Sequence, residues 1–515
     1  MAVRCVIGCD IGSQGVKTVL LSAEGEILAE AGAGYAVDYP RPAWAEQPAQ
    51  RWIEALETSI AEVLQTANVP GEAVAAIGLD GQVDGFVAVD AHGKPLYPAI
   101  IWMDRRALPQ YARAAETLDA DRIFRLSGLN LDPYHVALKI RWLAENEPRL
   151  YEAARYFLLP CSYVAYWLTG EAAVDYSNAS STLLMDITRR AWSAELCAGF
   201  DVPMERMPPI RPANAVIGGL RPQVAERLGL RPHIAVTVGC GDEHAACLGA
   251  GVIQPGLVCD IAGTAEPVAA ASSQPLFDAD KLVETHAHAH PDLWLMENPG
   301  FVSGGNYRWF RDQFSPQEVQ QAARASLNPY DLLNQAAEGI PPGCEGLVML
   351  PTLMGAVTPT WNALARGVFY GFSLSHRREH FIRAVMEASA YALRDITDQM
   401  QRMGLALSEI RAVGGGARSS LWRQIKADVC GLPVTLLQTV ETTALGAALL
   451  GLHAGRLTAS LEEGVQAVTR IQETRQPDPH NMRRYEEYYQ LYRSLYFSLL
   501  PVFEHSAKIE AAAGG

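Results

Sequence analysis

Two similar segments, half the chain length apart, constrain the fold of this sequence of 515 residues more than any other feature. Cys9-Asp10-Ile11-Gly12-Ser13 and Cys259-Asp260-Ile261-Ala262-Gly263 each follow a run of β-forming residues and lead into small or apolar residues. A chain of this length is too long for one simple core. The repeat therefore predicts two related α/β domains that face each other, each offering a hairpin to the same ligand.

Each segment predicts a β-hairpin whose tip is rich in Gly, Ser, Thr and Gln. Backbone N–H groups exposed at such a tip suit phosphate oxygens. Asp10 ends the first strand, where a carboxylate is placed to hold a hydrated magnesium ion, because Mg²⁺ prefers carboxylate and water oxygens. The alternative for either segment alone is an ordinary hairpin with a turn-stabilising aspartate.

Asp242 lies in a third constrained segment, residues 239–246, where an apolar strand over 234–238 ends in a glycine-flanked turn before a helix. Two interpretations remain open. As an N-cap, the carboxylate would accept hydrogen bonds from the first free N–H groups of the helix. As a general base, it would act where the flanking glycines let a substrate approach closely.

Three glycines, Gly414 to Gly416, separate a predicted strand over 410–413 from a helix over 421–430. Such a run lets a flat ligand or a phosphate approach the backbone. It is not a GxGxxG motif and no acidic residue follows at dinucleotide spacing, so a Rossmann fold is excluded. Residues 442–452 predict a small-residue helix able to pack tightly, and tyrosines over 485–496 predict a terminal helix packed back on the body.

His286, His288 and His290 alternate along a predicted strand. Alternating imidazoles can bind a metal. The face of a hairpin is the simpler interpretation, because nothing nearby supplies an obvious carboxylate partner. Whether the three histidines bind anything stays open.

The chain carries 57 acidic and 42 basic residues, a formal net charge of −15, which argues against nucleic acid or an anionic membrane as a main partner. It does not exclude nucleotides, which backbone N–H groups hold locally. The nine cysteines are scattered without a CxxC pair, as reduced core thiols are. No signal peptide is evident, and no apolar run reaches the ~18 residues that a membrane helix needs. We therefore expect a cytoplasmic protein.

With these segments in place, the chain resembles the FGGY family of carbohydrate kinases, and within it the xylulokinases most, from about Val6 to about Leu452. The segments that carry the resemblance are 10–17, 45–48, 81–85, 102–105, 241–242, 263–264, 308–312, 414–419 and 421–424. Each of them is a weak signal alone, and together they are a strong one.

The resemblance implies an α/β fold of two actin-like (ribonuclease H-like) ATPase domains with a catalytic cleft between them, which closes on a sugar and on ATP with Mg²⁺. Residues 1–252 would form the N-terminal domain with the sugar site and the catalytic base. Residues 253–480 would form the C-terminal domain that binds ATP, and 481–515 a terminal helix and tail. We also expect a homodimer.

By resemblance, Asp242 is the base that accepts the proton of the sugar hydroxyl, and Asp10 orients magnesium. Phosphoryl transfer through a loose transition state asks mainly for positioning and charge neutralisation. An aspartate near its ordinary pKa is ionised at pH 7, so we expect no special tuning of Asp242. The residues expected to contact ATP are Gly12, Ser13, Gln14, Lys17, Gly263, Thr264, Gly305, Gly415, Gly416, Ala417 and Ser420.

The expected sugar pocket departs from the xylulokinase pattern. Val83-Asp84 stands where xylulokinases usually carry Met-His, and Glu243 where Asn or Gln is frequent. Residues 131–134 look more like the corresponding glycerol kinase stretch. The candidate substrate contacts are Val83, Asp84, Tyr134, Asp242 and Glu243. If the Asp84 and Glu243 carboxylates face the pocket, their charge favours a neutral polyhydroxy substrate and disfavours an aldonate or a sugar phosphate.

The predicted activity is ATP-dependent phosphorylation of a sugar hydroxyl, with D-xylulose to D-xylulose 5-phosphate as the first expectation. A glycerol- or erythritol-type polyol kinase, or another ketose kinase, is the alternative within the same chemistry. An actin-like ATP-binding assembly protein without sugar turnover is the alternative from another class, and Asp242 discriminates between the classes. The identity and stereochemistry of the sugar stay open.

Overall fold

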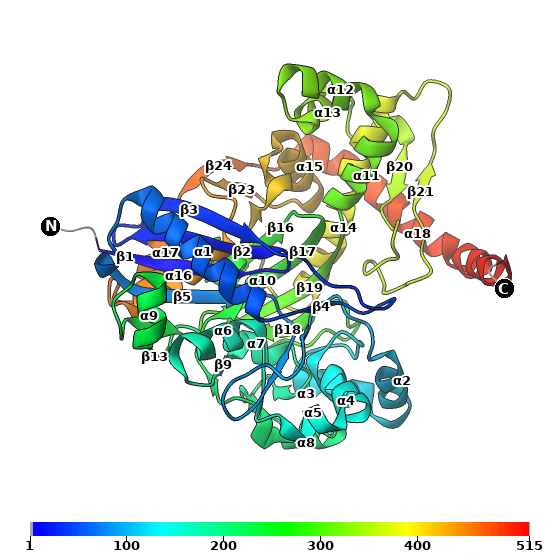
Figure 1. Cartoon of the computed structure of the whole chain (residues 1–515). Coiled ribbons are helices and arrows are strands. Elements are labelled where there is room, and N and C mark those ends of the chain that lie inside the picture. The colour runs from blue at the N-terminus through cyan, green and yellow to red at the C-terminus, as the bar shows by residue number, and fades with distance from the viewer. Residues whose placement is uncertain (1–3, 514–515) are drawn as a thin grey trace.

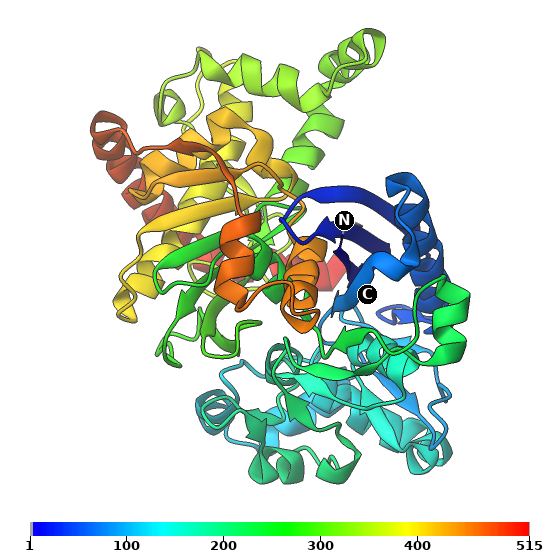
Figure 2. The same ribbon diagram turned by 90° about the vertical axis from the view of Figure 1, so that its left-hand side faces the viewer.

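Two seven-stranded mixed sheets organise the computed structural model, which describes residues 4–513 (Figures 1 and 2). Along the first sheet lie β13 (Val216–Gly219), β14 (Ala235–Thr237), β5 (Val74–Gly81), β1 (Cys5–Ile11), β2 (Gly15–Ser22) and β3 (Ile27–Gly34), and β15 (Cys240–Gly241) also pairs with β5. Along the second lie β18 (Glu284–Ala287), β19 (Trp294–Val302), β17 (Ala265–Ser272), β16 (Leu257–Ile261), β22 (Glu409–Val413), β23 (Val434–Leu437) and β24 (Ile471–Arg475).

The two sheets share one topology, as the repeated segments predicted. In each, three strands form an antiparallel meander, β1–β2–β3 in the first sheet and β16–β17–β19 in the second. On its other side the first strand of each meander begins a parallel series. In the first sheet β1 pairs with β5 and β5 with β14, and in the second β16 pairs with β22 and β22 with β23. An additional edge strand, β18, extends the second sheet beyond β19.

Side chains alternate between the two faces of β1, because successive Cβ atoms of a strand point in opposite directions. Ile7 and Cys9 pack in the core formed with α1 (Gln50–Ala67). Val6 and Gly8 face the opposite way, toward α16 (Thr443–Ala454). Asp10 has the same parity as Val6 and Gly8, so it belongs to the face covered by α16.

Helix α16 comes from the second half of the chain yet packs on the first sheet, where Figure 2 shows it between the blue strands and the second domain. Glycine residues, which have no side chain, allow this close contact. A Cβ at Gly78 of β5 would lie 1.8 Å from the Ala447 carbonyl oxygen, and one at Gly446 would lie 2.0 Å from that of Ala245 on α10 (Asp242–Gly249). The prediction of a tightly packed small-residue helix is confirmed.

The first domain also contains a region of short helices and strands, formed by the chain between β5 and β14 together with β4 (Figure 1). Its helices are α2 (Leu108–Thr117), α3 (Ala120–Ser127), α4 (Val136–Asn146), α5 (Pro148–Ala153), α6 (Pro160–Thr169), α7 (Tyr176–Ser180), α8 (Ala194–Gly199) and α9 (Pro222–Leu228). Its small sheets pair β4 (Glu46–Gln47) with β7 (Ala99–Ile100), β6 (Val87–Val89) with β8 (Tyr156–Leu158), β9 (Val174–Asp175) with β12 (Ile210–Arg211), and β10 (Met185–Asp186) with β11 (Ala191–Trp192).

This region meets the edge strand β18 of the second sheet. The Thr285 amide donates to the Gly128 carbonyl at 2.9 Å, and the Ala287 amide donates to Ser180 Oγ at 3.1 Å. The free edge of the second sheet is thereby covered by the first domain, which is one way in which proteins protect an unpaired strand.

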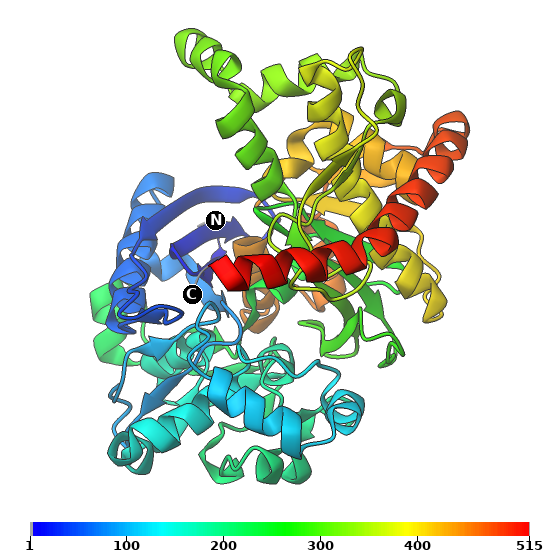
Figure 3. The same ribbon diagram turned by 90° about the vertical axis from the view of Figure 1, so that its right-hand side faces the viewer.

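The second domain holds the remaining helices. They are α11 (Gly304–Phe314), α12 (Pro316–Ala325), α13 (Pro329–Glu338), α14 (Arg378–Arg402), α15 (Ser420–Cys430) and α17 (Leu461–Val468), with the hairpin β20 (Val348–Leu350) and β21 (Val368–Tyr370). The last helix, α18 (Pro479–Ala513), runs the length of this domain (Figure 3).

Helix α18 packs back on the body through buried tyrosines, as the sequence predicted. The Tyr485 hydroxyl donates to Glu387 Oε1 at 2.9 Å, and the Tyr489 hydroxyl donates to Asp395 Oδ1 at 2.8 Å. Both acceptors stand on α14, so the long terminal helix is fixed by polar as well as apolar contacts.

All nine cysteines are free thiols, and all but Cys430 are buried. Within residues 4–513, no helix combines the length and the apolar character that crossing a membrane requires.

We expect Gly78→Ala to destabilise the protein by about 1–3 kcal/mol, because the added methyl group must push the backbone of α16 off β5. Urea unfolding of both proteins measures the difference. Gly339→Ala is the matched control, because its Cβ would meet nothing within 4 Å and its φ of −75° suits alanine. Equal stability of the Gly78→Ala variant and the native protein would contradict this account of the packing.

Candidate active site

Asp242 is the first residue of α10, and the N-cap position belongs to Gly241, with φ −69° and ψ 148° and no side-chain capping bond. The N-cap interpretation of Asp242 is therefore wrong. The strand β15 carries extended backbone only as far as Gly241, so the helix starts one residue earlier than a cap at Asp242 requires. The Asp242 carboxylate accepts a hydrogen bond from the Glu243 amide at 3.0 Å.

Asp10, Asp80 and Asp242 form a carboxylate cluster at the ends of neighbouring strands. Parallel pairing of β1 with β5 sets Asp10 beside Asp80. Burial raises the pKa of Asp80 well above its ordinary value, and the nearby Asp10 and Asp242 carboxylates raise it further. Burial likewise raises the pKa of Asp10 to about 6. The sequence prediction omitted Asp80, although it follows an apolar strand just as Asp10 does.

The pKa of Asp242 is raised to about 8, first by burial and then by the Glu243 and Asp10 carboxylates. The expectation of an ordinary pKa is therefore wrong, because it ignored the burial of Asp242 and the clustering of like charges that the fold produces. Lys17, across from Asp10 in the β1–β2 register, is paired with Glu441 at 2.9 Å.

The cluster suits a hydrated divalent cation. Within residues 4–513, one oxygen of Asp10 and both oxygens of Asp80 are buried without a hydrogen-bond partner. No group of three or more acidic, histidine or cysteine side chains in the described part of the chain is arranged to enclose a metal directly. Mg²⁺ keeps several waters and takes one or two carboxylates together with substrate phosphates, which matches this donor set.

The corresponding aspartate of the second sheet has a different environment. The Lys426 ammonium lies 2.5 Å from Asp260 Oδ2 and 2.9 Å from Glu266 Oε1, and all three side chains are buried. These carboxylates raise the pKa of Lys426 above its ordinary value, against the lowering effect of burial. An internal cation thus neutralises Asp260, so the two repeats share a backbone but only the first leaves its carboxylate uncompensated.

Most of the residues expected to contact ATP lie together on the second domain. At the β16–β17 tip, where Gly263 and Thr264 are exposed, the Gly305 amide of α11 donates to Thr264 O at 3.0 Å. The Gly416 amide donates to Ala262 O at 2.9 Å. Gly415, Gly416 and Ala417 form the 3₁₀ helix η4 (Gly415–Arg418) beside this tip.

Ser420 stands just beyond η4 at the start of α15, where its Oγ accepts a hydrogen bond from Arg475 at 2.6 Å. On the first domain, the Gly12 amide donates to Gly15 O across the β1–β2 turn at 3.0 Å. Ser13 Oγ accepts from Trp102 Nε1 at 2.7 Å, and Gln14 is exposed.

The candidate sugar contacts adjoin Asp242. Val83 packs against Gly241, since a Cβ there would lie 2.6 Å from Val83 Cγ1. Asp84 adopts a left-handed φ of 56°. Its carboxylate lies near enough to Glu243 and Tyr134 to contribute to the raised pKa of each, which burial raises most. The structure therefore brings the five predicted substrate contacts into one region.

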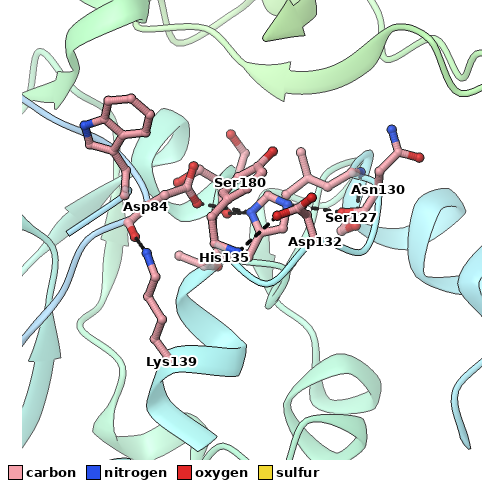
Figure 4. Close-up of polar contacts among 12 residues, drawn as sticks. Asp84, Ser127, Asn130, Asp132, His135, Lys139 and Ser180 are labelled. Atoms are coloured by element: carbon pink, nitrogen blue, oxygen red, sulfur yellow. Dashed lines mark hydrogen bonds and ion pairs between the residues drawn. The ribbon is translucent and has the colours of Figure 1, made fainter. Parts of the chain in front are cut away.

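His135 lies beneath this region and was missed by the sequence prediction (Figure 4). Its Nδ1 is 3.1 Å from Asp84 Oδ1 and 2.8 Å from Ser181 O, and its Nε2 is 3.1 Å from Asn130 O. All three partners are acceptors, so both ring nitrogens carry hydrogen and the ring is held as an imidazolium.

Lys139, one helical turn further along α4, is fully buried and donates to Asp84 O at 2.6 Å and to Ile101 O at 2.8 Å (Figure 4). Burial lowers its pKa to about 7. His135 is the N-cap residue of α4, Lys139 lies four residues further along, and both support Asp84. That spacing, directly after residues 131–134, was the available signal in the sequence.

The three alternating histidines have three separate surroundings. Only His286 lies on β18, with Nε2 3.7 Å from Glu284 Oε2. His288 Nε2 is 2.9 Å from Val252 O, and His290 Nε2 is 2.9 Å from Glu462 Oε1. Carboxylates do lie beside two of these rings, which the sequence prediction did not identify.

Family models match both halves of the chain. The N-terminal domain of the FGGY family of carbohydrate kinases matches residues 5–249, and the C-terminal domain matches residues 260–455. The chain belongs to this family. Kinases of this family use ATP, and the two-domain actin-like fold predicted from the sequence is confirmed.

Relatives of this FGGY kinase include sugar and polyol kinases. The xylulose kinase of Bacillus subtilis (strain 168) is 30% identical over 498 residues, which cover 96% of this chain and 97% of that one. A glycerol kinase of Halorhodospira halophila (strain DSM 244 / SL1) is 30% identical over 461 residues, 87% of this chain and 88% of that one. The crystal structure of xylulose kinase from Rhodospirillum rubrum matches with a TM-score of 0.89 and 29% identity, covering 97% of this chain and 100% of that one.

We expect the stability cost of His135→Gln in this FGGY kinase to depend on pH. The Asp84 carboxylate raises the pKa of His135 above its ordinary value, overcoming the opposing effect of burial. A raised folded-state pKa gives stability that is complete below the unfolded-state value of about 6.5 and is lost as pH rises through the folded-state value. Urea unfolding at about pH 5.5, 7 and 8.5 should show the largest cost, about 1–3 kcal/mol, at the lowest pH.

The exposed His92 provides the control, because His92→Gln should change the free energy of unfolding little at any of these pH values. A cost of His135→Gln that stays constant from acid to alkaline pH would contradict the imidazolium assignment.

Proposed function

We propose that this FGGY kinase transfers the γ-phosphoryl group of ATP to a hydroxyl group of a small neutral ketose or polyol, with D-xylulose to D-xylulose 5-phosphate as the leading reaction. The observation that carries the proposal is the Asp10–Asp80–Asp242 cluster on the face of the first sheet that α16 covers. The xylulose kinases among the relatives support the choice of sugar.

Asp242 is the proposed general base. Its pKa of about 8 lies close to neutral pH, where a base both takes and returns a proton efficiently. Its position at the start of α10, next to Gly241 and Val83, leaves little bulk between the carboxylate and an approaching hydroxyl group.

Asp10 and Asp80 would hold Mg²⁺, which neutralises charge on the transferred phosphoryl group when bound. The exposed tips of the β1–β2 and β16–β17 hairpins would contact phosphates through backbone N–H groups. Gly415, Gly416 and Ala417 would lie against the adenosine, with Ser420 nearby. Residues 1–252, 253–480 and 481–515 are the proposed domain boundaries, and a homodimer remains our expectation.

A polyol kinase is the second candidate. The glycerol kinase among the relatives is as similar in sequence as the xylulose kinase is, although it covers less of the chain. Tyr134, whose ring lies beneath the Arg105 guanidinium at 5.2 Å, belongs to the glycerol-kinase-like stretch. Both candidates use the same base and the same carboxylate cluster, so only a comparison of substrates separates them.

We expect Asp242→Asn to lower kcat about 10²- to 10⁴-fold, the usual contribution of a general base, while ATP and sugar still bind. A coupled ADP-release assay measures turnover, and calorimetric titration measures binding. Asp331→Asn, at an exposed position of α13, is the control with the same change of charge. Parallel loss of turnover and of both binding events would point to a structural role for Asp242.

We also expect neutral substrates to outperform an aldonate, because the Asp84 and Glu243 carboxylates repel a third negative charge. The assay compares kcat/KM for D-xylulose, other pentuloses, glycerol, erythritol and gluconate, and D-xylulose should rank first. A preference for gluconate over every neutral compound would overturn the proposed substrate class, whereas a preference for erythritol or glycerol would select the second candidate.

A further inference from the structure

The β18–β19 hairpin of the second domain carries three buried ionisable side chains on one face. Glu284 and His286 are two residues apart on β18, and Glu284 pairs across the strands with Glu297 of β19. Residues two apart, and residues directly opposite in an antiparallel pair, share a face. Glu284 and Glu297 are only 2% and 3% exposed, and His286 is 6% exposed.

This face is turned toward the proposed sugar contacts of the first domain. Glu284 Oε1 accepts from the Asn130 amide at 2.8 Å, in the loop that also supports His135. Glu297 is close enough to Glu243 for their carboxyl groups to share a hydrogen bond. The His286 ring packs edge-on against that of His244, the second residue after Asp242, with centroids 5.6 Å apart.

Six side chains from both domains thus form what we call the two-domain cluster. Its members are Asp84, His135, Glu243, Glu284, His286 and Glu297. It is continuous with Asp242 through Glu243, its neighbour along α10.

Buried polar atoms of this cluster lack partners. Among residues 4–513, neither ring nitrogen of His286 has a hydrogen-bond partner, and Glu297 Oε2 has none either. Folded proteins pair the great majority of such atoms, because leaving one unpaired costs about 1–3 kcal/mol. His286 Nε2 is directed toward the cluster, 3.7 Å from Glu284. A ligand that supplies the missing partners accounts for these atoms.

The chemistry of the cluster defines that ligand. Ionised carboxylates only accept hydrogen bonds, and imidazole accepts or donates one at each nitrogen. A bound molecule must therefore offer several donors, as hydroxyl groups do, and it must not bring a further negative charge. Direct enclosure of a metal ion is not supported, since no group of the described side chains has the necessary arrangement.

We propose that Glu284, His286 and Glu297 complete the sugar site from the second domain, by binding hydroxyl groups of an uncharged polyhydroxy substrate at the end remote from the phosphorylated hydroxyl. This inference rests on the proposed function, because it takes Asp242 to mark the reacting end. Both domains then contact the sugar, so that its recognition depends on how the domains are placed relative to each other.

The test uses Glu297→Gln and His286→Asn in the full-length enzyme, with Glu338→Gln at an exposed position of α13 as the matched control. For each protein, KM for D-xylulose, KM for ATP, kcat and the ratio of kcat/KM for gluconate to that for D-xylulose are measured. We expect KM for the sugar to rise about tenfold or more in both variants, while KM for ATP stays within about twofold. A tenfold rise corresponds to a loss of about 1.4 kcal/mol in the free energy of sugar binding.

Glu297→Gln should leave the gluconate-to-xylulose ratio within about twofold, because burial and the Glu243 carboxylate raise the pKa of Glu297 well above its ordinary value, so the amide replaces a neutral carboxyl group and removes no charge. A merely structural role would change stability or kcat without raising the KM for the sugar. Should Glu297→Gln fail to bind ATP, Glu297→Asp decides instead: it keeps the carboxyl group but withdraws it from the site, so the sugar KM should rise while gluconate stays rejected.

Sugar KM values that remain within about twofold of the native enzyme in every variant able to bind ATP would overturn this inference and leave the proposed function intact. A native enzyme that prefers gluconate would overturn the proposed function and the neutral ligand together. The two failures are therefore distinguishable, since only the second is visible without any substitution.

Discussion

The contact on which the structure depends most is the close packing of helix α16 on the first sheet, which glycine residues make possible. Helix α16, encoded near the end of the chain, lies directly on β1 and β5 and crosses α10 at glycine positions such as Gly78 and Gly446. Close backbone approach of this kind needs glycine, because any Cβ would overlap a neighbouring carbonyl group. The contact joins the two halves of the molecule and fixes the face of the first sheet from which Asp10, Asp80 and Asp242 arise.

Electrostatics distinguishes the working site from its structural copy. Asp260 occupies the position in the second sheet that Asp10 occupies in the first, but Lys426 compensates its charge within the fold. Asp10 and Asp80 retain unpaired oxygens, as Asp260 does, but within residues 4–513 no ion pair compensates their charge, and burial raises their pKa values. Buried groups left without partners are costly, so their persistence at the end of a sheet indicates that a ligand completes them. The same reasoning extends to the two-domain cluster around Glu297.

Much of the architecture could be predicted from local patterns. The repeated segments around Asp10 and Asp260 indicated two domains of one topology, and the small residues over 442–452 indicated a closely packed helix, because both patterns are visible within a few neighbouring residues. Asp80, His135 and Lys139 were missed. Each gains its importance from a partner far away in sequence, Asp10 for the first and the Asp84 region for the others, and such distances are set only by folding.

The sequence by itself determined the family, the paired hairpins and the candidate base, since these depend on residue types at short spacing. The tertiary structure decided how those parts behave. It placed the N-cap of α10 at Gly241 and not at Asp242, raised the pKa of Asp242 by burying it among other carboxylates, and brought Glu297 of one domain beside Glu243 of the other. The physical reason is that burial and charge coupling depend on distances in space, which no local pattern of residues contains.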